Sequence, residues 1–121
     1  MPSVLEKIKG GYLLWHKIHT ILPQANRYTL GNRIDKLFIE VIESIAAATF
    51  LQRGEKTPYV RLAIRKLDTL KVLLLVLWEV KSIENKKYVQ LSTTLEETGR
   101  MLGGWHNQLI KQNSPAKAGE K

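Results

Sequence analysis

Residues 57–81 read TPYVRLAIRKLDTLKVLLLVLWEVK, and their pattern predicts a long, strongly apolar helix. Thr57 is predicted to cap a helix, with Pro58 as its first residue, because the fixed φ of proline suits a first turn where its missing N–H is not needed. Leucines then recur at helical spacing and predict one wide buried face. They are Leu62, Leu67, Leu70, Leu73, Leu74 and Leu77.

The same helix carries a second apolar set that points away from the leucine face. It consists of Ile64, Val72, Leu75 and Val76. A helix in a bundle of four buries one stripe, so this second set needs a different cover. Another subunit is the simplest cover, and the sequence therefore predicts an oligomer with these four residues in its interface.

Three further segments, at about 4–22, 30–52 and 87–112, show the same helical periodicity. Their expected stripes are Val4, Ile8, Gly11, Trp15, Ile18 and Leu22; Leu30, Ile34, Leu37, Val41, Ile45 and Ala48; and Tyr88, Leu91, Leu95, Thr98, Leu102, Trp105 and Leu109. Loops are expected at 23–26, 53–58 and 82–87. Short loops favour antiparallel neighbours, so we predict an all-α, antiparallel, up-down-up-down four-helix bundle over residues 1–112. Residues 113–121 are expected to form a basic, disordered tail.

Glycines interrupt the first and last of these helices, at Gly10 and Gly11 and at Gly99, Gly103 and Gly104. Glycine lowers helix stability, so each is expected to have a compensating reason. We predict close approach of another helix, or a kink.

Composition narrows the class of protein. The 121 residues fit one domain, cysteine is absent, and the formal net charge is +8. Such a charge favours a polyanionic partner, whether nucleic acid, an anionic surface or an acidic protein. The N-terminal stretch lacks signal-peptide features, and no run approaches the roughly 20 apolar residues of a membrane span. A cytoplasmic location is therefore expected, without membrane contact.

Catalysis finds little support in the residue pattern. His16 and His19 lie one helical turn apart, but His106 is distant and zinc needs three or four ligands. The serines have no nucleophile motif around them, and no nucleotide-binding glycine pattern occurs. We therefore expect no enzyme, no cofactor and no metal site.

Basic residues are the stronger indication of function. The predicted nucleic-acid contacts are Arg61, Arg65, Lys71, Lys81, Lys86 and Lys87. For any one of them, the alternative is an ordinary solvated surface charge. The three tryptophans are interpreted as packing residues, so base stacking is only a weak expectation and binding should be largely independent of nucleotide sequence.

Two segments resemble signatures of one family of small four-helix-bundle proteins. Residues 22–34, LPQANRYTLGNRI, resemble its "LP…RYTLG.RI" signature, and residues 99–105, GRMLGGW, resemble its second signature. The family contains the accessory variability determinant of diversity-generating retroelements. It also contains proteins encoded within intervening sequences of large-subunit ribosomal RNA genes. The likeness covers about residues 4–112.

The resemblance implies a homopentameric barrel with a basic surface and no catalytic activity. In the retroelement setting, such proteins bind the reverse transcriptase and RNA or DNA, and they are required for mutagenic copying of a template repeat (mutagenic retrohoming). The alternative is a ribosome-associated or protein-interaction module, as among the relatives encoded in ribosomal RNA genes.

The resemblance also marks signature positions, most of which are interpreted as structural. They are Tyr28, Thr29, Gly31, Arg33, Gly99, Arg100, Gly103 and Trp105. Thr29 would cap the second helix, the glycines would permit close packing, and Trp105 would fill the core. For Arg33 and Arg100 we favour buried ion pairs with Asp35, Glu96 or Glu97 over direct contact with nucleic acid.

Overall fold

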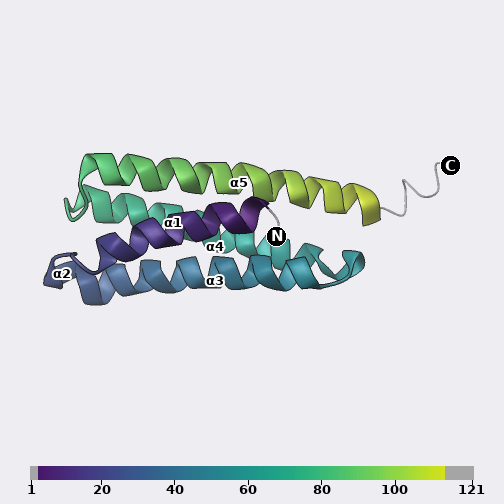
Figure 1. The fold of residues 1–121 in the computed structure, drawn as a ribbon, viewed down its shortest axis with the longest axis horizontal. Helices are drawn as coiled ribbons and strands as arrows, with labels where there is room; N and C mark the ends of the chain where they lie inside the picture. The colour runs from purple at the N-terminus through teal and green to yellow at the C-terminus, as the bar shows by residue number, and fades with distance from the viewer. Residues whose placement is uncertain (1–2, 114–121) are drawn as a thin grey trace.

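The structure, a computed structural model, describes residues 3–113, and this part of the chain is almost entirely helical (Figure 1). No strand occurs within this range. The long helices are α1 (Ser3–His19), α3 (Asn32–Phe50), α4 (Thr57–Glu79) and α5 (Asn85–Asn113). Three short elements join them: α2 (Gln24–Asn26), η1 (Arg27–Gly31) and η2 (Arg53–Glu55). The tail expected at 113–121 lies outside the described residues, apart from Asn113, which ends α5.

The four long helices pack as a helical bundle. α1 contacts α3 and α5, and α4 contacts the same two helices, so α1 and α4 lie on opposite sides of the bundle. In Figure 1 the connections from α1 to α3 and from α4 to α5 lie at the left end, and the connection from α3 to α4 lies at the right end. The end of α1 and the α4–α5 connection are neighbours, because Leu22, Ser82 and Ile83 line the same small pocket.

Most residues of the expected stripes form the core, whereas Leu30, Tyr88 and Trp105 are only partly buried against it. Every residue of the first stripe is buried, including Trp15, which is fully inaccessible. Leu67, Leu70, Leu74 and Leu77 fill the centre from α4, while Leu62 and Leu73 are only partly buried. Phe38 of α3 is also fully buried, although it lies outside the expected stripe. It stacks beside Trp15, with ring centroids 6.1 Å apart.

The loop predicted at 23–26 is wrong, because the chain is already helical from Gln24. α2 continues through η1, a π-helical turn, directly into α3. Thr29 therefore lies inside a helical segment and does not cap one. Pro23 precedes the first helical residue, a position at which its missing N–H costs nothing. The Arg27 guanidinium donates hydrogen bonds of 3.1 and 2.8 Å to the Leu22 carbonyl oxygen, which holds the preceding turn against this segment.

The end of α4 uses a residue in an uncommon backbone conformation. Lys81 has φ of 63°, in the left-handed region that favours glycine. The Ser82 N–H donates to the Leu77 carbonyl oxygen at 3.1 Å, and the Lys81 N–H donates to that of Trp78 at 2.9 Å. These are the two hydrogen bonds of a Schellman motif, and they orient the α4–α5 connection. The start of α4 differs by one position from the prediction, because Lys56 is the flanking residue and Thr57 is already helical.

The glycines do not share one explanation. A Cβ on Gly11 would lie 3.1 Å from Thr94 Cγ2, so the close helix crossing expected there is confirmed between α1 and α5. On Gly99 it would meet Leu67 and Lys71 at an ordinary 3.5 Å. An added Cβ on Gly10, Gly103 or Gly104 would have no atom of another described helix within 4 Å, so close packing inside the protomer does not account for these glycines.

Candidate nucleic-acid interface

Four of the six predicted nucleic-acid residues present free charges at the surface. They are Arg61, Arg65, Lys81 and Lys86, which are exposed and have no acidic partner within residues 3–113. The outward position of Arg61 and Arg65 follows from the helical period, because both fall on the side of α4 opposite its buried leucines. Such unpaired cations can attract phosphate without first breaking an ion pair.

The other two residues are partly compensated. Lys71 Nζ lies 3.7 Å from Asp68 Oδ1 and 3.4 Å from Glu96 Oε1. Lys87 Nζ lies 3.4 Å from Glu84 Oε1. Exposed pairs of this kind stabilise a protein little, but they cancel charge locally, so Lys71 and Lys87 add less to the field than the four unpaired residues.

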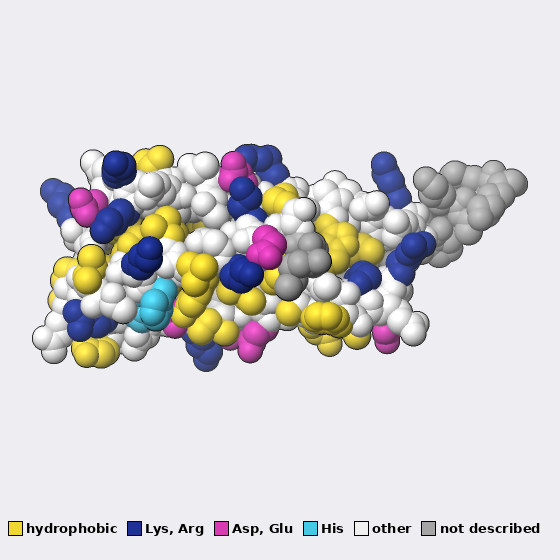
Figure 2. Space-filling view, viewed as in Figure 1, with side chains coloured by type: hydrophobic (Ala, Val, Ile, Leu, Met, Phe, Trp, Pro, Cys, Tyr) yellow, Lys and Arg dark blue, Asp and Glu magenta, His cyan; other side chains and the backbone are white. Residues whose placement is uncertain are grey.

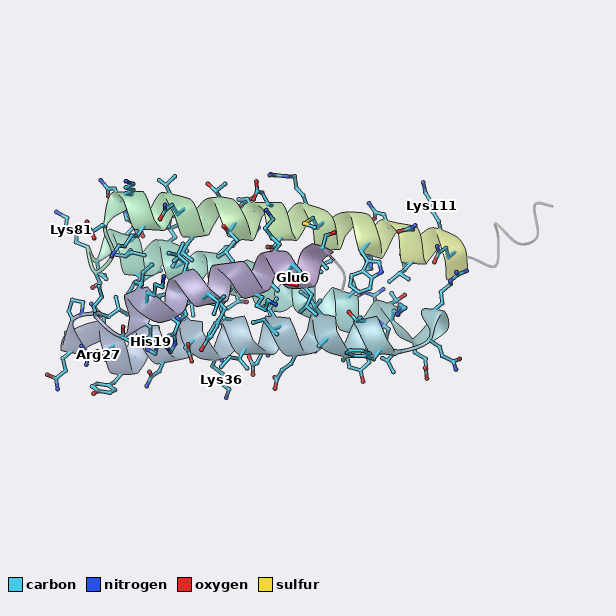
Figure 3. All side chains as sticks on the ribbon, viewed as in Figure 1. Glu6, His19, Arg27, Lys36, Lys81 and Lys111 are labelled. Atoms are coloured by element: carbon cyan, nitrogen blue, oxygen red, sulfur yellow. The ribbon has the colours of Figure 1, made fainter. Side chains whose placement is uncertain are left out.

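The structure divides the predicted residues between two places. Arg61 and Arg65 lie near the beginning of α4, whereas Lys81, Lys86 and Lys87 surround its far end. A helix rises ~1.5 Å per residue, so Arg61 and Glu79 are separated by roughly 27 Å along α4. Figure 3 shows Lys81 and Arg27 at the same end of the bundle and Lys111 at the other end.

The structure also shows unpaired cations that the sequence-based list of nucleic-acid contacts did not include. Lys17, Lys36, Arg53 and Lys111 are all exposed without an acidic partner in the described chain. Around Lys17, Arg53 and Lys111 no acid stands three or four residues away, a signal that the sequence already contained. Figure 2 shows the result on one face, where lysine and arginine side chains are scattered over the length of the bundle and outnumber acidic ones.

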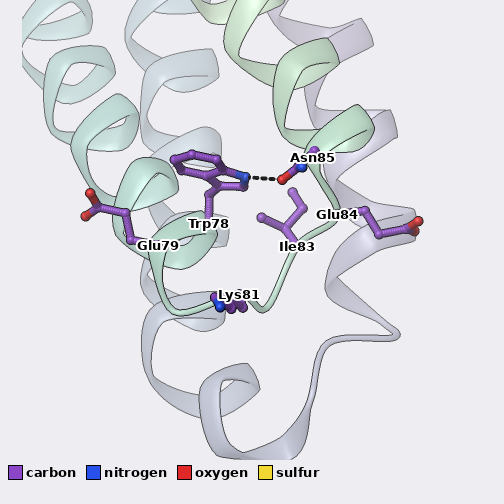
Figure 4. A pocket seen from close by; sticks show the side chains of 6 residues that line it. All are labelled: Trp78, Glu79, Lys81, Ile83, Glu84 and Asn85. Carbon is purple, nitrogen blue, oxygen red and sulfur yellow. Dashed lines mark hydrogen bonds between the residues drawn. The ribbon is translucent and has the colours of Figure 1, made fainter.

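A pocket of about 770 Å³ lies at the α4–α5 connection, next to Lys81 (Figure 4). Its lining residues are Trp78, Glu79, Lys81, Ile83, Glu84 and Asn85. The Trp78 indole N–H donates a 2.7 Å hydrogen bond to Asn85 Oδ1. The Trp78 ring also stacks on Tyr88, with centroids 5.0 Å apart and planes inclined by 16°. Trp78 is thus a partly exposed pocket wall as well as a packing residue.

The predicted oligomer residues are exposed to different degrees. Val72 is 58% exposed and Leu75 is 38% exposed, whereas Ile64 and Val76 are partly buried within the protomer. Beside Val72 and Leu75, a shallow groove of about 220 Å³ runs between α4 and α5. Arg61 and Arg65 lie along the same outer side of α4, so this side combines an apolar half with a basic half.

The structure places the signature positions as follows. Gly31 is confined: a Cβ there would lie 3.0 Å from Leu22 Cδ1 and 3.1 Å from His19 Cδ2. Gly103 is open, Tyr28 is 63% exposed, and Trp105 is only partly buried.

The buried ion pairs predicted for Arg33 and Arg100 do not form among residues 3–113. Both side chains are exposed, and Glu40, at 3.9 Å, is the one acid in this described range that Arg33 approaches. Their expected acidic partners face other residues, because Glu96 pairs with Lys71 and Glu97 pairs with Lys7.

The third expected partner, Asp35, belongs to a polar cluster between α1 and α3. Its Oδ1 accepts a 3.2 Å hydrogen bond from the Trp15 indole and lies 3.7 Å from His19 Nδ1. Burial, and secondly the nearby Asp35 carboxylate, raise the pKa of the Tyr12 hydroxyl. His19 Nε2 lies 3.2 Å from Asn32 Oδ1, which ties the end of α1 to the start of α3. Among residues 3–113 no group of three histidine or acidic side chains is arranged to hold a metal ion.

Comparisons with known proteins found no matching family model, no matching curated protein and no matching solved structure. No helix within residues 3–113 combines the length and the apolar character that a bilayer crossing requires.

Proposed function

We propose that this chain is a non-enzymatic accessory protein of a diversity-generating retroelement. It binds the reverse transcriptase and RNA or DNA in the cytoplasm and supports mutagenic reverse transcription. The working form is a cyclic homo-oligomer of antiparallel up-down-up-down bundles, and the family resemblance makes it a pentamer. The two sequence signatures support the retroelement setting.

The observation that carries the binding proposal is the set of exposed cations without acidic partners, above all Arg61, Arg65, Lys81 and Lys86. In a ring each of them repeats once per subunit, so a protomer of net charge +8 gives a strongly positive assembly. Each neutralised phosphate releases counterions, which drives binding without reading the base sequence.

Fluorescence anisotropy with labelled single strands of RNA and DNA, at several salt concentrations, tests this binding. The logarithm of the association constant should fall with that of the salt concentration, with a slope of about −0.7 per neutralised phosphate. Changing Arg61 and Arg65 to Gln, or Lys81 and Lys86 to Gln, should weaken binding to all sequences and flatten the slope. The control removes the same charge at Lys9 and Lys66, which pair with Glu6 and Glu40, and should weaken binding less. Absence of binding at low salt refutes the proposal.

The assembly is tested by light scattering. Val72→Glu places a charge in the proposed interface and should lower the subunit number. Leu13→Glu is the matched control, because Leu13 on α1 is also 58% exposed but lies outside that interface. A wild-type monomer at micromolar concentration, or equal effects of both variants, contradicts the proposed interface.

A second candidate is a protein-interaction module associated with the ribosome. The exposure of Val72 and Leu75 favours it, since an apolar surface on α4 suits a protein better than a phosphate backbone. Co-purification of a co-encoded reverse transcriptase supports the first function. A gene position inside a ribosomal RNA gene, rather than beside a reverse transcriptase gene with paired repeats, supports the second.

A further inference from the structure

We infer that the pocket at the α4–α5 connection holds an unstacked base of a single-stranded nucleic acid against the Trp78 ring. This inference rests on the proposed function and adds an aromatic contact to the contacts between exposed cations and phosphates. The volume of the pocket, about 770 Å³, lies within the ~300–1,000 Å³ that is common for ligand pockets.

The aromatic wall is fixed before any ligand arrives. Tyr88 stacks on Trp78, and the Trp78 N–H is held by Asn85 Oδ1 at 2.7 Å. Holding a ring in place in the free protein reduces the entropy lost when a base stacks on it. Every base has a π-face, so stacking here tolerates any sequence, as the proposed function requires.

Asn85 supplies a polar contact with a defined orientation. An indole N–H can only donate, so the side-chain oxygen of Asn85 must be the atom that faces Trp78. The Asn85 Nδ2 group therefore points elsewhere, and it has no partner among the residues that the structure describes. It can donate to a ring nitrogen or carbonyl oxygen of a base. Ile83, which is 6% exposed, provides an apolar contact in the same pocket.

The charges around the pocket favour a strand over a cationic ligand. Lys81 lines the pocket, and Lys86 follows one residue after Asn85; neither has an acidic partner in the described chain. In Figure 4 the Glu79 and Glu84 side chains point away from the space between Trp78 and Ile83, toward opposite sides. Glu84 is also paired with Lys87. The two carboxylates thus lie outside the space that a base would fill, and the two free lysines are available to the flanking phosphates.

Abasic strands separate stacking from charge. The probes are single strands of about 12 nucleotides, in RNA and DNA forms, each compared with an abasic strand of equal length and charge. Wild-type protein should bind strands that carry bases roughly five- to 150-fold more tightly than abasic ones. Comparison of the RNA and DNA forms shows whether the pocket prefers one kind of strand or binds both equally.

Substitutions locate the effect. Trp78→Leu should remove the preference for bases while leaving affinity for abasic strands unchanged, and Trp78→Phe should retain much of it. Trp105→Leu, at the other partly buried tryptophan, is the matched control and should keep the preference. Changing Lys81 and Lys86 to Gln should weaken binding of both kinds of strand by the same factor.

Each alternative outcome is distinct. Equal binding of normal and abasic strands by the wild type overturns the base pocket but leaves the charge-based function standing, and this comparison needs no variant. Failure to bind either strand at low salt overturns both. Quenching of tryptophan fluorescence by an arginine-rich peptide, without quenching by strands, overturns the inference in favour of a cation-binding pocket beside Trp78.

Discussion

Replacement of Gly31 by alanine tests the packing of the π-helical segment. The backbone at Gly31 is right-handed helical, with φ of −59° and ψ of −48°, so alanine can adopt it without strain. A methyl group there would lie 3.0 Å from Leu22 Cδ1, 3.1 Å from His19 Cδ2 and 3.2 Å from the Asn26 carbonyl oxygen. The two side chains can shift slightly, but the carbonyl moves only if the π-helical turn opens.

The magnitude follows from a matched comparison with Gly10→Ala. Both substitutions gain the ~1 kcal/mol by which alanine exceeds glycine in a helix. At Gly10 the added methyl would have no atom of another described helix within 4 Å, so this gain should appear as greater stability. At Gly31 overpacking costs about 1–3 kcal/mol. The Gly31→Ala variant should therefore be about 1–3 kcal/mol less stable than Gly10→Ala.

Urea unfolding followed by far-UV circular dichroism measures this difference. Both variants and the wild type are compared at one protein concentration, because assembly adds to apparent stability. An unchanged m-value shows that the variants differ in stability and not in the extent of unfolding. Equal stabilisation by the two substitutions would refute the reasoning, since Gly31 would then not be confined.

Three more outcomes can be measured in the same way. Lys81→Gly should stabilise the protein by about 0.5–1 kcal/mol relative to Lys81→Ala, because both remove the charge but only glycine adopts φ of 63° freely; equal stability would contradict this. Lys56→Met should destabilise the protein by about 1–2 kcal/mol, because the Lys56 ammonium donates hydrogen bonds of 2.6 and 3.3 Å to the Ala48 and Thr49 carbonyl oxygens at the end of α3. The control Lys86→Met removes an unpaired lysine and should change the stability little. The raised pKa of Tyr12 means that folding favours its neutral form, so this contribution is complete below about pH 10 and is lost as pH rises further. Tyr12→Phe should reduce that alkaline loss, and an unchanged loss in urea unfolding above pH 10 would exclude Tyr12 as its source.

The charge distribution shows where prediction from sequence stops. The helical period placed Arg61 and Arg65 outside the apolar stripe of their helix, and the structure confirms that both are exposed. The same period could not show that Lys71 faces Glu96, because that pair joins α4 to α5 across a helix contact. The ion pairs predicted for Arg33 and Arg100 failed for this reason. Which acid a long side chain reaches depends on the rotation and the axial shift of neighbouring helices.

Hydrophobic periodicity by itself determined that this chain is helical, and it correctly identified most of the core, such as Trp15 and Leu70. The apolar positions repeat every 3.6 residues, so the buried face of each helix can be recognised from the sequence of that helix alone. The π-helical turn at Gly31 and the pocket beside Trp78 could not be predicted from that periodicity and were found only in the folded protein. Both depend on contacts between successive elements of the chain and not on the period of one helix: the end of α1 packs against Gly31, and Asn85 of α5 holds the Trp78 ring. Local propensity carries no information about such contacts, because their energies arise only after the helices have packed.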